Sequence, residues 1–249
     1  MSDLSGLTAV ITGAGSGIGL ATARSLTAAG ARVFGLDLDP GEMQGVAEWI
    51  SCDIGSTEHV STAFATLSNT LTSLDILVNN AGIGAVGTVE DSSDDEWMRV
   101  LNVNVVGIAR VTRAALPLLR ASNVASIVNT CSIAATVGLP QRAVYSASKG
   151  AVQSLTLAMA ADHMVDGIRV NCVNPGTAGT PWVARLLDLA HDPIAERNAL
   201  EQRQPNGRLV TPEEVANAIR FLASPDQRSI TATVLAVDGG MDGLRVRPR

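Results

Sequence analysis

Apolar and polar positions along the chain follow two patterns that take turns. Short runs rich in Val, Ile and Leu recur from residue 7 onward, separated by longer segments whose apolar residues are spaced as on one helix face. This alternation is typical of parallel strands joined by crossover helices. It predicts seven strands, at Leu7–Thr12, Arg32–Asp37, Trp49–Asp53, Ile76–Asn79, Ser126–Ser132, Arg169–Val173 and Val234–Val237.

The segments between these strands predict the helices. Thr211 and Pro212 form a typical helix start, with an N-cap residue followed by proline at the first position. The predicted helices are Gly17–Ala29, Thr57–Leu71, Asp95–Arg120, Tyr145–Asp162 and Pro212–Ala223. We therefore expect an α/β fold, a doubly wound seven-stranded parallel sheet of the Rossmann type with helices on both faces.

The chain is long enough to bury a full core, because it has 249 residues of which 46% are hydrophobic. We expect one domain over residues 1–249. Between Gly176 and Gly207 the alternation gives way to amphipathic helical pieces that contain three prolines. An excursion of this length inside a compact domain usually covers a site, so we expect a substrate lid at residues 176–207.

Charge and composition exclude several classes of protein. The formal net charge is −6 and the basic residues are mostly scattered, so no nucleic-acid partner is expected. The sequence has no signal-peptide pattern and no run of 18 apolar residues, which predicts a cytoplasmic protein without a membrane partner. Its cysteines, Cys52, Cys131 and Cys172, form no C-x-x-C pair, so we expect buried thiols rather than disulfides or a metal site.

A glycine-rich turn, TGAGSGIG at residues 12–19, follows the first strand and opens the first helix. Its backbone amides can approach a pyrophosphate at the helix N-terminus, although a plain tight turn also needs glycine. Asp37 ends the second strand, where its carboxylate can accept hydrogen bonds from the ribose hydroxyls and repel a 2′-phosphate. Because Leu38 follows it and Ser16 lies in the turn, no basic residue is near, which favours NAD over NADP.

Two further strand ends carry polar residues at the same edge of the sheet. Asp53 can accept from an adenine amino group while Ile54 covers the ring. The segment NNAG at residues 79–82 places two amides and two small residues where such folds bind ligands. Asn79 also has a purely structural interpretation.

The candidate chemistry lies around the fifth strand and the helix after it. Tyr145 and Lys149 are four residues apart, so they share a helix face, and the ammonium favours the phenolate needed for proton exchange with an alcohol. The Ser132 hydroxyl can bond the reacting oxygen. Asn104 can hold a water that continues a proton path from Lys149. A hydrolase is disfavoured, because the histidines form no constellation with Ser132 and no G-x-S-x-G motif exists.

Together, the motifs at residues 12–19, 79–82, 104, 132, 145–149 and 174–176 resemble the short-chain dehydrogenase/reductase family over the whole chain. The resemblance implies Tyr145 as acid/base, Lys149 as its activator and a ribose ligand, Ser132 as substrate orienter and Asn104 as proton relay. It also implies a homotetramer. The expected NAD-binding residues are Gly13, Ser16, Gly17, Ile18, Gly19, Asp37, Leu38, Asp53, Ile54, Asn80, Ala81, Gly82, Tyr145, Lys149, Pro175, Gly176, Ala178 and Thr180.

Three arginines provide the substrate hypothesis. Arg142 stands shortly before Tyr145, and Arg185 and Arg203 lie in the predicted lid, where planar guanidiniums can clamp a carboxylate. At these arginines and in the segments 174–181, 203–208 and 238–240, the chain resembles a subgroup of cytosolic 3-hydroxybutyrate and 2-keto-3-deoxy sugar-acid dehydrogenases. It departs from that subgroup in a loop one residue shorter between Ser132 and Tyr145, and in Ala85 and Val86, which stand where bulkier polar residues are common.

The leading hypothesis is an NAD-dependent dehydrogenase of a small hydroxy acid or sugar acid. A 3-oxoacyl or steroid-type carbonyl reductase is the alternative within enzymes, and Asp37 weighs against it because biosynthetic reductases usually take NADP. A catalytically idle NAD-binding regulator is the alternative of another class. Its weakness is that Ser132, Tyr145 and Lys149 are all intact.

Overall fold

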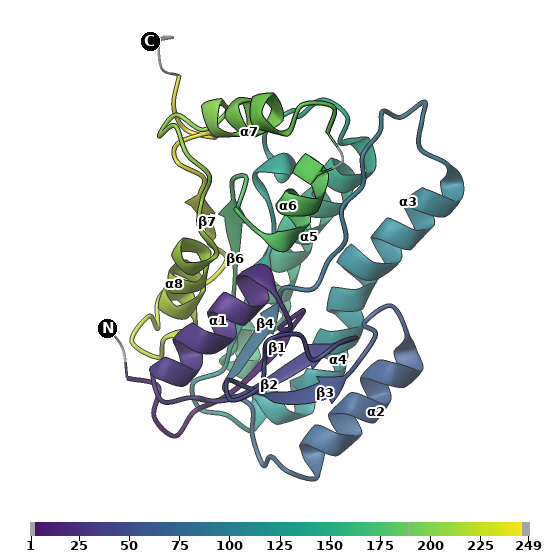
Figure 1. The fold of residues 1–249 in the computed structure, drawn as a ribbon. Helices are drawn as coiled ribbons and strands as arrows, with labels where there is room; N and C mark the ends of the chain where they lie inside the picture. Colours follow the sequence, from purple (N-terminus) through teal and green to yellow (C-terminus); the bar gives the residue numbers. More distant parts are fainter. Residues whose placement is uncertain (1–2, 189, 246–249) are drawn as a thin grey trace.

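The structure, a computed structural model, describes residues 3–188 and 190–245 (Figure 1). Its strands form one parallel sheet in the order β3-β2-β1-β4-β5-β6-β7. Their bounds are β1 Thr8–Thr12, β2 Arg32–Asp37, β3 Glu48–Ser51, β4 Ile76–Asn79, β5 Ser126–Thr130, β6 Arg169–Pro175 and β7 Val234–Val237. The predicted doubly wound α/β fold is confirmed, and the strand order reverses between β1 and β4, where such sheets open a crevice.

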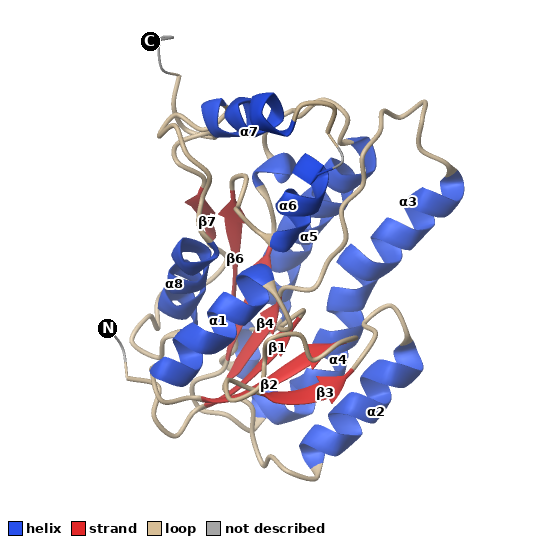
Figure 2. Cartoon of the chain, in the orientation of Figure 1, coloured by secondary structure: helices blue, strands red, loops and turns tan. Residues whose placement is uncertain are grey.

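Helices cover both faces of this sheet (Figure 2). The two faces arise because neighbouring strand residues point in opposite directions, so Ile11 packs with α1 and α8 while Val10 packs with α2, α4 and α5. Each face buries its own apolar cluster, which fixes the sheet and the loops at its carboxyl edge. The helix bounds are α1 Gly17–Ala28, α2 Thr57–Ser68, α4 Gly107–Arg120, α5 Ala143–Asp162 and α8 Pro212–Ala223.

The long helix predicted at Asp95–Arg120 is interrupted. The chain forms α3 over Asp94–Leu101, then a π-helical turn, η1, over Asn102–Val106, before α4. In the π-helical turn, Asn102 donates to the Gly55 carbonyl and Asn104 bonds the backbone of Ile83. These bonds to neighbouring loops stabilise a widened turn that apolar periodicity cannot reveal.

Several predicted strand and helix ends are also wrong by one to three residues. β5 ends at Thr130, because Ser132 instead caps the short 3-10 helix η2 at Ile133–Ala135. β3 ends at Ser51, and Asp53 accepts from the Gly55 amide in the following turn. The remaining changes are a start of β1 at Thr8, of β3 at Glu48 and of α5 at Ala143, an end of α1 at Ala28 and of α2 at Ser68, and an extension of β6 to Pro175.

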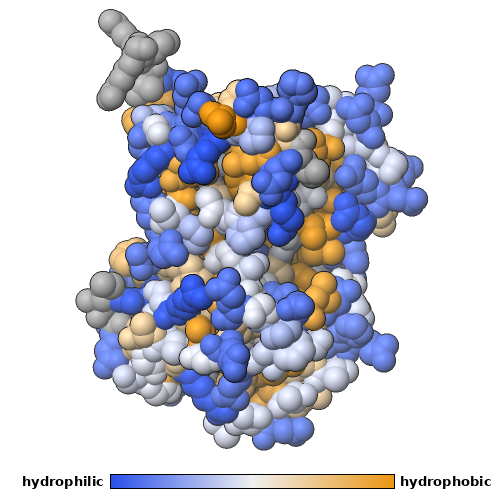
Figure 3. All heavy atoms as spheres, in the orientation of Figure 1, coloured by the Kyte–Doolittle hydropathy of each residue, from blue (hydrophilic) through white to orange (hydrophobic). Residues whose placement is uncertain are grey.

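Two helices lie within residues 176–207, α6 at Pro181–Asp188 and α7 at Pro193–Gln202. They lie at the end of the molecule toward which β6 and β7 point (Figure 1). On this face apolar residues reach the surface beside α6, within an otherwise mostly hydrophilic exterior (Figure 3). Within residues 3–188 and 190–245, no helix combines the length and the apolar character needed to cross a membrane.

Candidate active site

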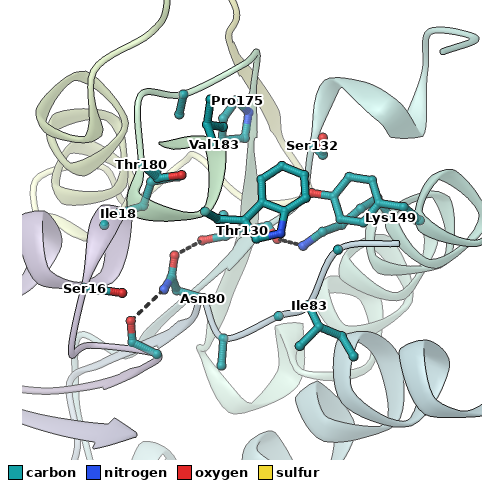
Figure 4. Close-up of a pocket in the computed structure, with 18 of the residues that line it drawn as sticks. Ser16, Ile18, Asn80, Ile83, Thr130, Ser132, Lys149, Pro175, Thr180 and Val183 are labelled. Carbon is teal, nitrogen blue, oxygen red and sulfur yellow. Dashed lines mark hydrogen bonds between the residues drawn. The ribbon is translucent and has the colours of Figure 1, made fainter. Parts of the chain in front are cut away.

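A pocket of about 480 Å³ opens at the carboxyl edge of the sheet. It extends from the glycine-rich turn and the ends of β2 and β3 to the start of α5 and to helices α6 and α7 (Figure 4). Of all the predicted site residues, Gly19 and Asn104 alone do not line it. Residues that the sequence separates by as many as 190 positions, from Gly13 to Arg203, therefore share one cavity.

The glycine-rich turn has the backbone shape that dinucleotide binding requires. Gly13 and Gly17 have φ of +68° and +52°, a region that other residues adopt at a cost. α1 begins at Gly17, so its first amides have no acceptor inside the helix and suit a pyrophosphate at this end of the pocket. A Cβ on Gly19 would lie 2.0 Å from the Gly13 carbonyl oxygen. Gly19 therefore permits close packing of helix and turn rather than lining the pocket.

The acidic and amide side chains at this end also hold the loops in place. Asp37 accepts from the amides of Gly15 and Leu38, at 2.8 and 2.7 Å. Asn80 donates to the carbonyls of Thr12 and Gly13 and accepts from the Thr130 hydroxyl at 3.4 Å. Its amide is thus engaged in fastening the turn to β5. The residues present fit a dinucleotide, with Asp37 fixed beside the turn that would hold its phosphates.

Lys149 is buried at the other end, with 5% of its surface exposed. Its Nζ donates to the Thr130 carbonyl at 2.9 Å and lies 5.8 Å from the centre of the Tyr145 ring (Figure 4). Both residues lie near the start of α5, as their spacing predicts. Ser132 lines the same part of the pocket, where its Oγ accepts from the Ala134 amide at 3.2 Å. This arrangement leaves the Ser132 hydroxyl hydrogen available to a ligand oxygen.

Asn104 lies behind the pocket wall rather than on it. Its Oδ1 accepts from the Ile83 amide at 2.8 Å, and its Nδ2 donates to the Ile83 carbonyl and the Ser148 hydroxyl. Ser148 in turn donates to the Tyr145 carbonyl at 2.7 Å. Asn104 therefore joins the loop after β4 to the helix that carries Tyr145, which agrees with the structural alternative that a buried helix asparagine also allows. Its predicted relay role stays a prediction.

The three arginines line the same pocket from different elements. Arg142 immediately precedes α5. The chain on either side of it is fixed to Gly87, whose amide donates to the Gln141 carbonyl and whose carbonyl accepts from the Ala143 amide. Burial, and then the neighbouring charge of Arg203, lower the pKa of the Arg142 guanidinium. Arg185 lies in α6 and Arg203 directly after α7. The ion pairs found within residues 3–188 and 190–245 include none of these three arginines.

Sequence interpretation missed the apolar residues of the pocket wall. Trp182 is the largest of them, and its place directly after Thr180 and Pro181 in the predicted lid was the available signal. The others are aliphatic side chains without distinctive chemistry, so periodicity assigned them only to helices or loops. They include Ile83, Leu139, Val183, Leu186 and Leu200.

The thiols near the pocket are buried, in agreement with the packing interpretation. Cys131 lies next to Ser132, and its Sγ donates to the Lys149 carbonyl at 3.0 Å. A hydrogen bond from Cys172 lowers the pKa of the Cys131 thiol, and the same contact together with burial raises the pKa of Cys172. Burial likewise raises the pKa of Cys52 to about 11, so this thiol stays protonated at neutral pH.

Known proteins with similar sequences indicate the family to which this fold and pocket belong. The enoyl-(acyl carrier protein) reductase family matches residues 13–242. The 2-(S)-hydroxypropyl-CoM dehydrogenase 3 of Xanthobacter autotrophicus is 38% identical over 94% of this chain and 96% of its own. The cis-4-hydroxycyclohexanecarboxylate dehydrogenase of Sinomonas cyclohexanicum is 39% identical over 93% of this chain and 95% of its own.

Among solved structures, the ligand-free aldohexose dehydrogenase of Thermoplasma acidophilum superposes with a TM-score of 0.92 and 34% identity, covering 99% of both chains. These relatives are dehydrogenases of hydroxy compounds, and their fold binds a nicotinamide cofactor. The chain thus belongs to the short-chain dehydrogenase/reductase family, whose members act on CH–OH groups by hydride transfer.

Proposed function

We propose that this protein is an NAD-dependent dehydrogenase that oxidises the secondary alcohol of a small hydroxy acid or sugar acid. One observation carries the proposal. Arg142, Arg185 and Arg203 line the pocket that also holds Tyr145 and Lys149, and no carboxylate among the described residues pairs with these arginines. Arg142 is half-buried, whereas Arg185 and Arg203 are exposed, and the charge of Arg203 disfavours the neighbouring Arg142 cation. A substrate carboxylate between these guanidiniums would relieve that repulsion.

The residues around Tyr145 support alcohol oxidation. When bound, the nicotinamide supplies the acceptor for the hydride of the carbinol C–H. The Tyr145 hydroxyl oxygen, as phenolate, takes the proton from the alcohol O–H, while Lys149 contributes the positive charge that favours this phenolate. Ser132 donates its hydroxyl hydrogen to the reacting oxygen, while the Ala134 amide, which donates to the Ser132 oxygen, holds the hydroxyl in place.

Asp37 supports NAD as the cofactor. Its carboxylate is held beside the glycine-rich turn by two backbone amides, so it cannot easily turn away from a bound ribose. A 2′-phosphate at this place would face a negative charge, and Leu38, which follows it in the pocket lining, offers no compensating positive charge. The carboxylate thus favours a free ribose diol.

The relatives support a hydroxy acid as substrate. The Sinomonas cyclohexanicum dehydrogenase is named for a substrate that carries both a hydroxyl and a carboxylate. The subgroup of 3-hydroxybutyrate and 2-keto-3-deoxy sugar-acid dehydrogenases that this sequence resembles also oxidises hydroxy acids. With three arginines at the pocket, an acid of this general kind is the substrate that best fits the charges present.

The decisive experiment compares a hydroxy acid with its methyl ester on the unmutated enzyme and on Arg203→Ala. A hydrogen bond to a charged group contributes ~1.5–3 kcal/mol, so kcat/KM for the acid should fall by roughly 10- to 150-fold, mainly through KM. The ester should lose little. Arg197→Ala is the matched control, because Arg197 lies on α7 in a surface ion pair with Glu201 and does not line the pocket.

Two results would overturn the proposal. Equal discrimination between acid and ester by both proteins would show that Arg203 does not bind the carboxylate. A preference of the unmutated enzyme for neutral alcohols over every hydroxy acid would remove the hydroxy-acid assignment and leave only the dehydrogenase chemistry.

A further inference from the structure

The indole of Trp182 forms a wall of the pocket at the end where the three arginines lie. We propose that this wall makes Trp182 the specificity-determining residue, and that the substrate body between its hydroxyl and its carboxylate is an aliphatic or alicyclic carbon frame rather than a polyhydroxylated sugar. This inference rests on the proposed function and narrows it from hydroxy acids in general to those with an apolar body.

The position of the indole is set by a glycine on the opposite loop. A Cβ on Gly84 would lie 2.4 Å from Cζ2 of Trp182 and 2.8 Å from its Cε2. The indole therefore rests on the bare backbone of Gly84, in the segment between β4 and α3. The contact between Trp182 of α6 and the loop that carries Gly84 closes one side of the pocket with the flat apolar face of the indole.

The same indole positions a substrate-binding charge. The guanidinium carbon of Arg142 lies 6.0 Å from the centre of the Trp182 ring, within the range of a cation–π interaction. Trp182 thus lies against the loop after β4 and within cation–π range of the residue before α5. A carboxylate held by Arg142 would leave the neighbouring part of its molecule against the indole.

The remaining side chains at this end share the apolar character of the indole. Residues 83–84, 132–145 and 181–203 contribute aliphatic groups beside the reacting Ser132 and Tyr145 and the three arginines. Across these ranges, no amide, carboxylate or imidazole side chain belongs to the described pocket lining. The aliphatic residues are Ile83, Ile133, Leu139, Pro181, Val183, Leu186 and Leu200.

This lining discriminates between the two substrate types that the arginines alone would accept. The additional hydroxyls of a sugar acid would lose their hydrogen bonds with water and meet carbon atoms instead, which costs affinity. An aliphatic or alicyclic frame loses no hydrogen bonds and buries apolar area against the indole. The pocket therefore selects against polyhydroxy acids.

The test measures kcat/KM for a 4-hydroxycyclohexanecarboxylate, for gluconate and for cyclohexanol on the unmutated enzyme, Trp182→Phe and Trp182→Ala. The gain or loss of one methylene in a hydrophobic pocket changes specificity by ~10- to 200-fold. Because the ring of the alicyclic acid has several such groups, the unmutated enzyme should prefer this acid to gluconate by at least about 10-fold in kcat/KM. Trp182→Ala should lower kcat/KM for the alicyclic acid by a similar factor, through KM, and Trp182→Phe should lose less.

Two controls separate specificity from folding. Ile194→Ala removes a side chain that is exposed on α7 and does not line the pocket, so it should change neither ratio. The dissociation constant of NADH should stay within about threefold in every variant, since the substrate wall is the part altered. Equilibrium binding of cyclohexanecarboxylate and gluconate to the NADH complex gives the same comparison where turnover is slow.

The outcomes separate the role of Trp182 from the proposed oxidation of a hydroxy acid. Gluconate turning over or binding as well as the alicyclic acid, or Trp182→Ala weakening both to the same extent, overturns the apolar wall. If cyclohexanol matches the alicyclic acid and both lose activity in Trp182→Ala, the carboxylate assignment fails while the role of Trp182 stands.

Discussion

Lys149 shows how one buried side chain organises the chemistry around it. Its ammonium is held by the Thr130 carbonyl, so it is fixed at 5.8 Å from the Tyr145 ring centre rather than free to reach solvent. A buried positive charge without a carboxylate partner favours a negative charge nearby. In the proposed reaction, the oxygen of Tyr145 carries this negative charge beside Lys149.

The variant Tyr145→Phe tests whether the phenol oxygen exchanges the proton. The variant keeps the ring and the pocket but removes the oxygen that exchanges the proton, so kcat should fall by ~10²–10⁴-fold. NADH should bind nearly as before, which fluorescence titration can check. Retention of more than about a tenth of the rate would contradict the assigned role.

Substitutions at Asp37 separate its two roles. Asp37→Asn keeps an oxygen that can accept from the Gly15 amide but removes the negative charge. The ratio of NADPH affinity to NADH affinity should therefore rise in Asp37→Asn, because repulsion of the 2′-phosphate is lost. Titration with both cofactors measures it.

Asp37→Ala is the companion variant, and it should weaken both cofactors because the turn also loses its anchor. Tighter binding of NADPH than NADH by the unmutated protein would show that the assignment of NAD is wrong.

Among the elements, the π-helical turn η1 links two ends of the pocket. Asn102 donates to the Gly55 carbonyl, and Arg110 of α4 donates to the carbonyls of Ile54 and Asn102. The loop after β3, which lines the expected adenine side, is therefore fixed to the segment that also holds Asn104. Arg110 is a positioning residue, because it reaches the pocket only through that loop.

This arrangement predicts that Arg110→Ala weakens NADH but spares a ligand without adenine. The loss of hydrogen bonds from a charged group costs ~1.5–3 kcal/mol, part of which should appear as a several-fold higher dissociation constant for NADH. Reduced nicotinamide mononucleotide should bind as before. Arg113→Ala, an exposed position on the same helix, is the control, and equal weakening of both ligands would refute the positioning role.

For the molecule as a whole, Arg169 ties the sheet to the helix layer. It starts β6, is 9% exposed, and donates to the carbonyls of Leu222, Ala223 and Ser224 at the end of α8 and of Ile230 in the segment before β7. Burial lowers the pKa of this guanidinium. Its positive charge also complements the carboxyl end of the α8 dipole.

We predict that Arg169→Met lowers the free energy of unfolding by about 3 kcal/mol or more, because several buried carbonyls lose their donor. Urea unfolding followed by circular dichroism measures this change. Arg169→Lys should recover part of the loss, since an ammonium still supplies donors. A loss below about 1 kcal/mol would show that water replaces the guanidinium without penalty.

Local patterns were sufficient for most of the fold. The order of strands and helices follows from apolar periodicity, because each element buries one face whatever its partners are. The glycine-rich turn and the Tyr145–Lys149 pair could also be predicted from the sequence, since each motif is defined by the spacing of a few neighbouring residues. Element ends were less readable, as with Ser132, because capping contacts compete with strand pairing.

Local motifs are enough to predict a dinucleotide turn followed in order by a serine, a tyrosine and a lysine. Which side chains surround these residues depends on the tertiary structure. It brought Arg142, Trp182 and Gly84 together, and it engaged Asn104 in bonds with Ile83 and Ser148. The physical reason is that these contacts join segments distant in the chain, whose approach depends on the packing of the whole core and leaves no period or motif in the sequence.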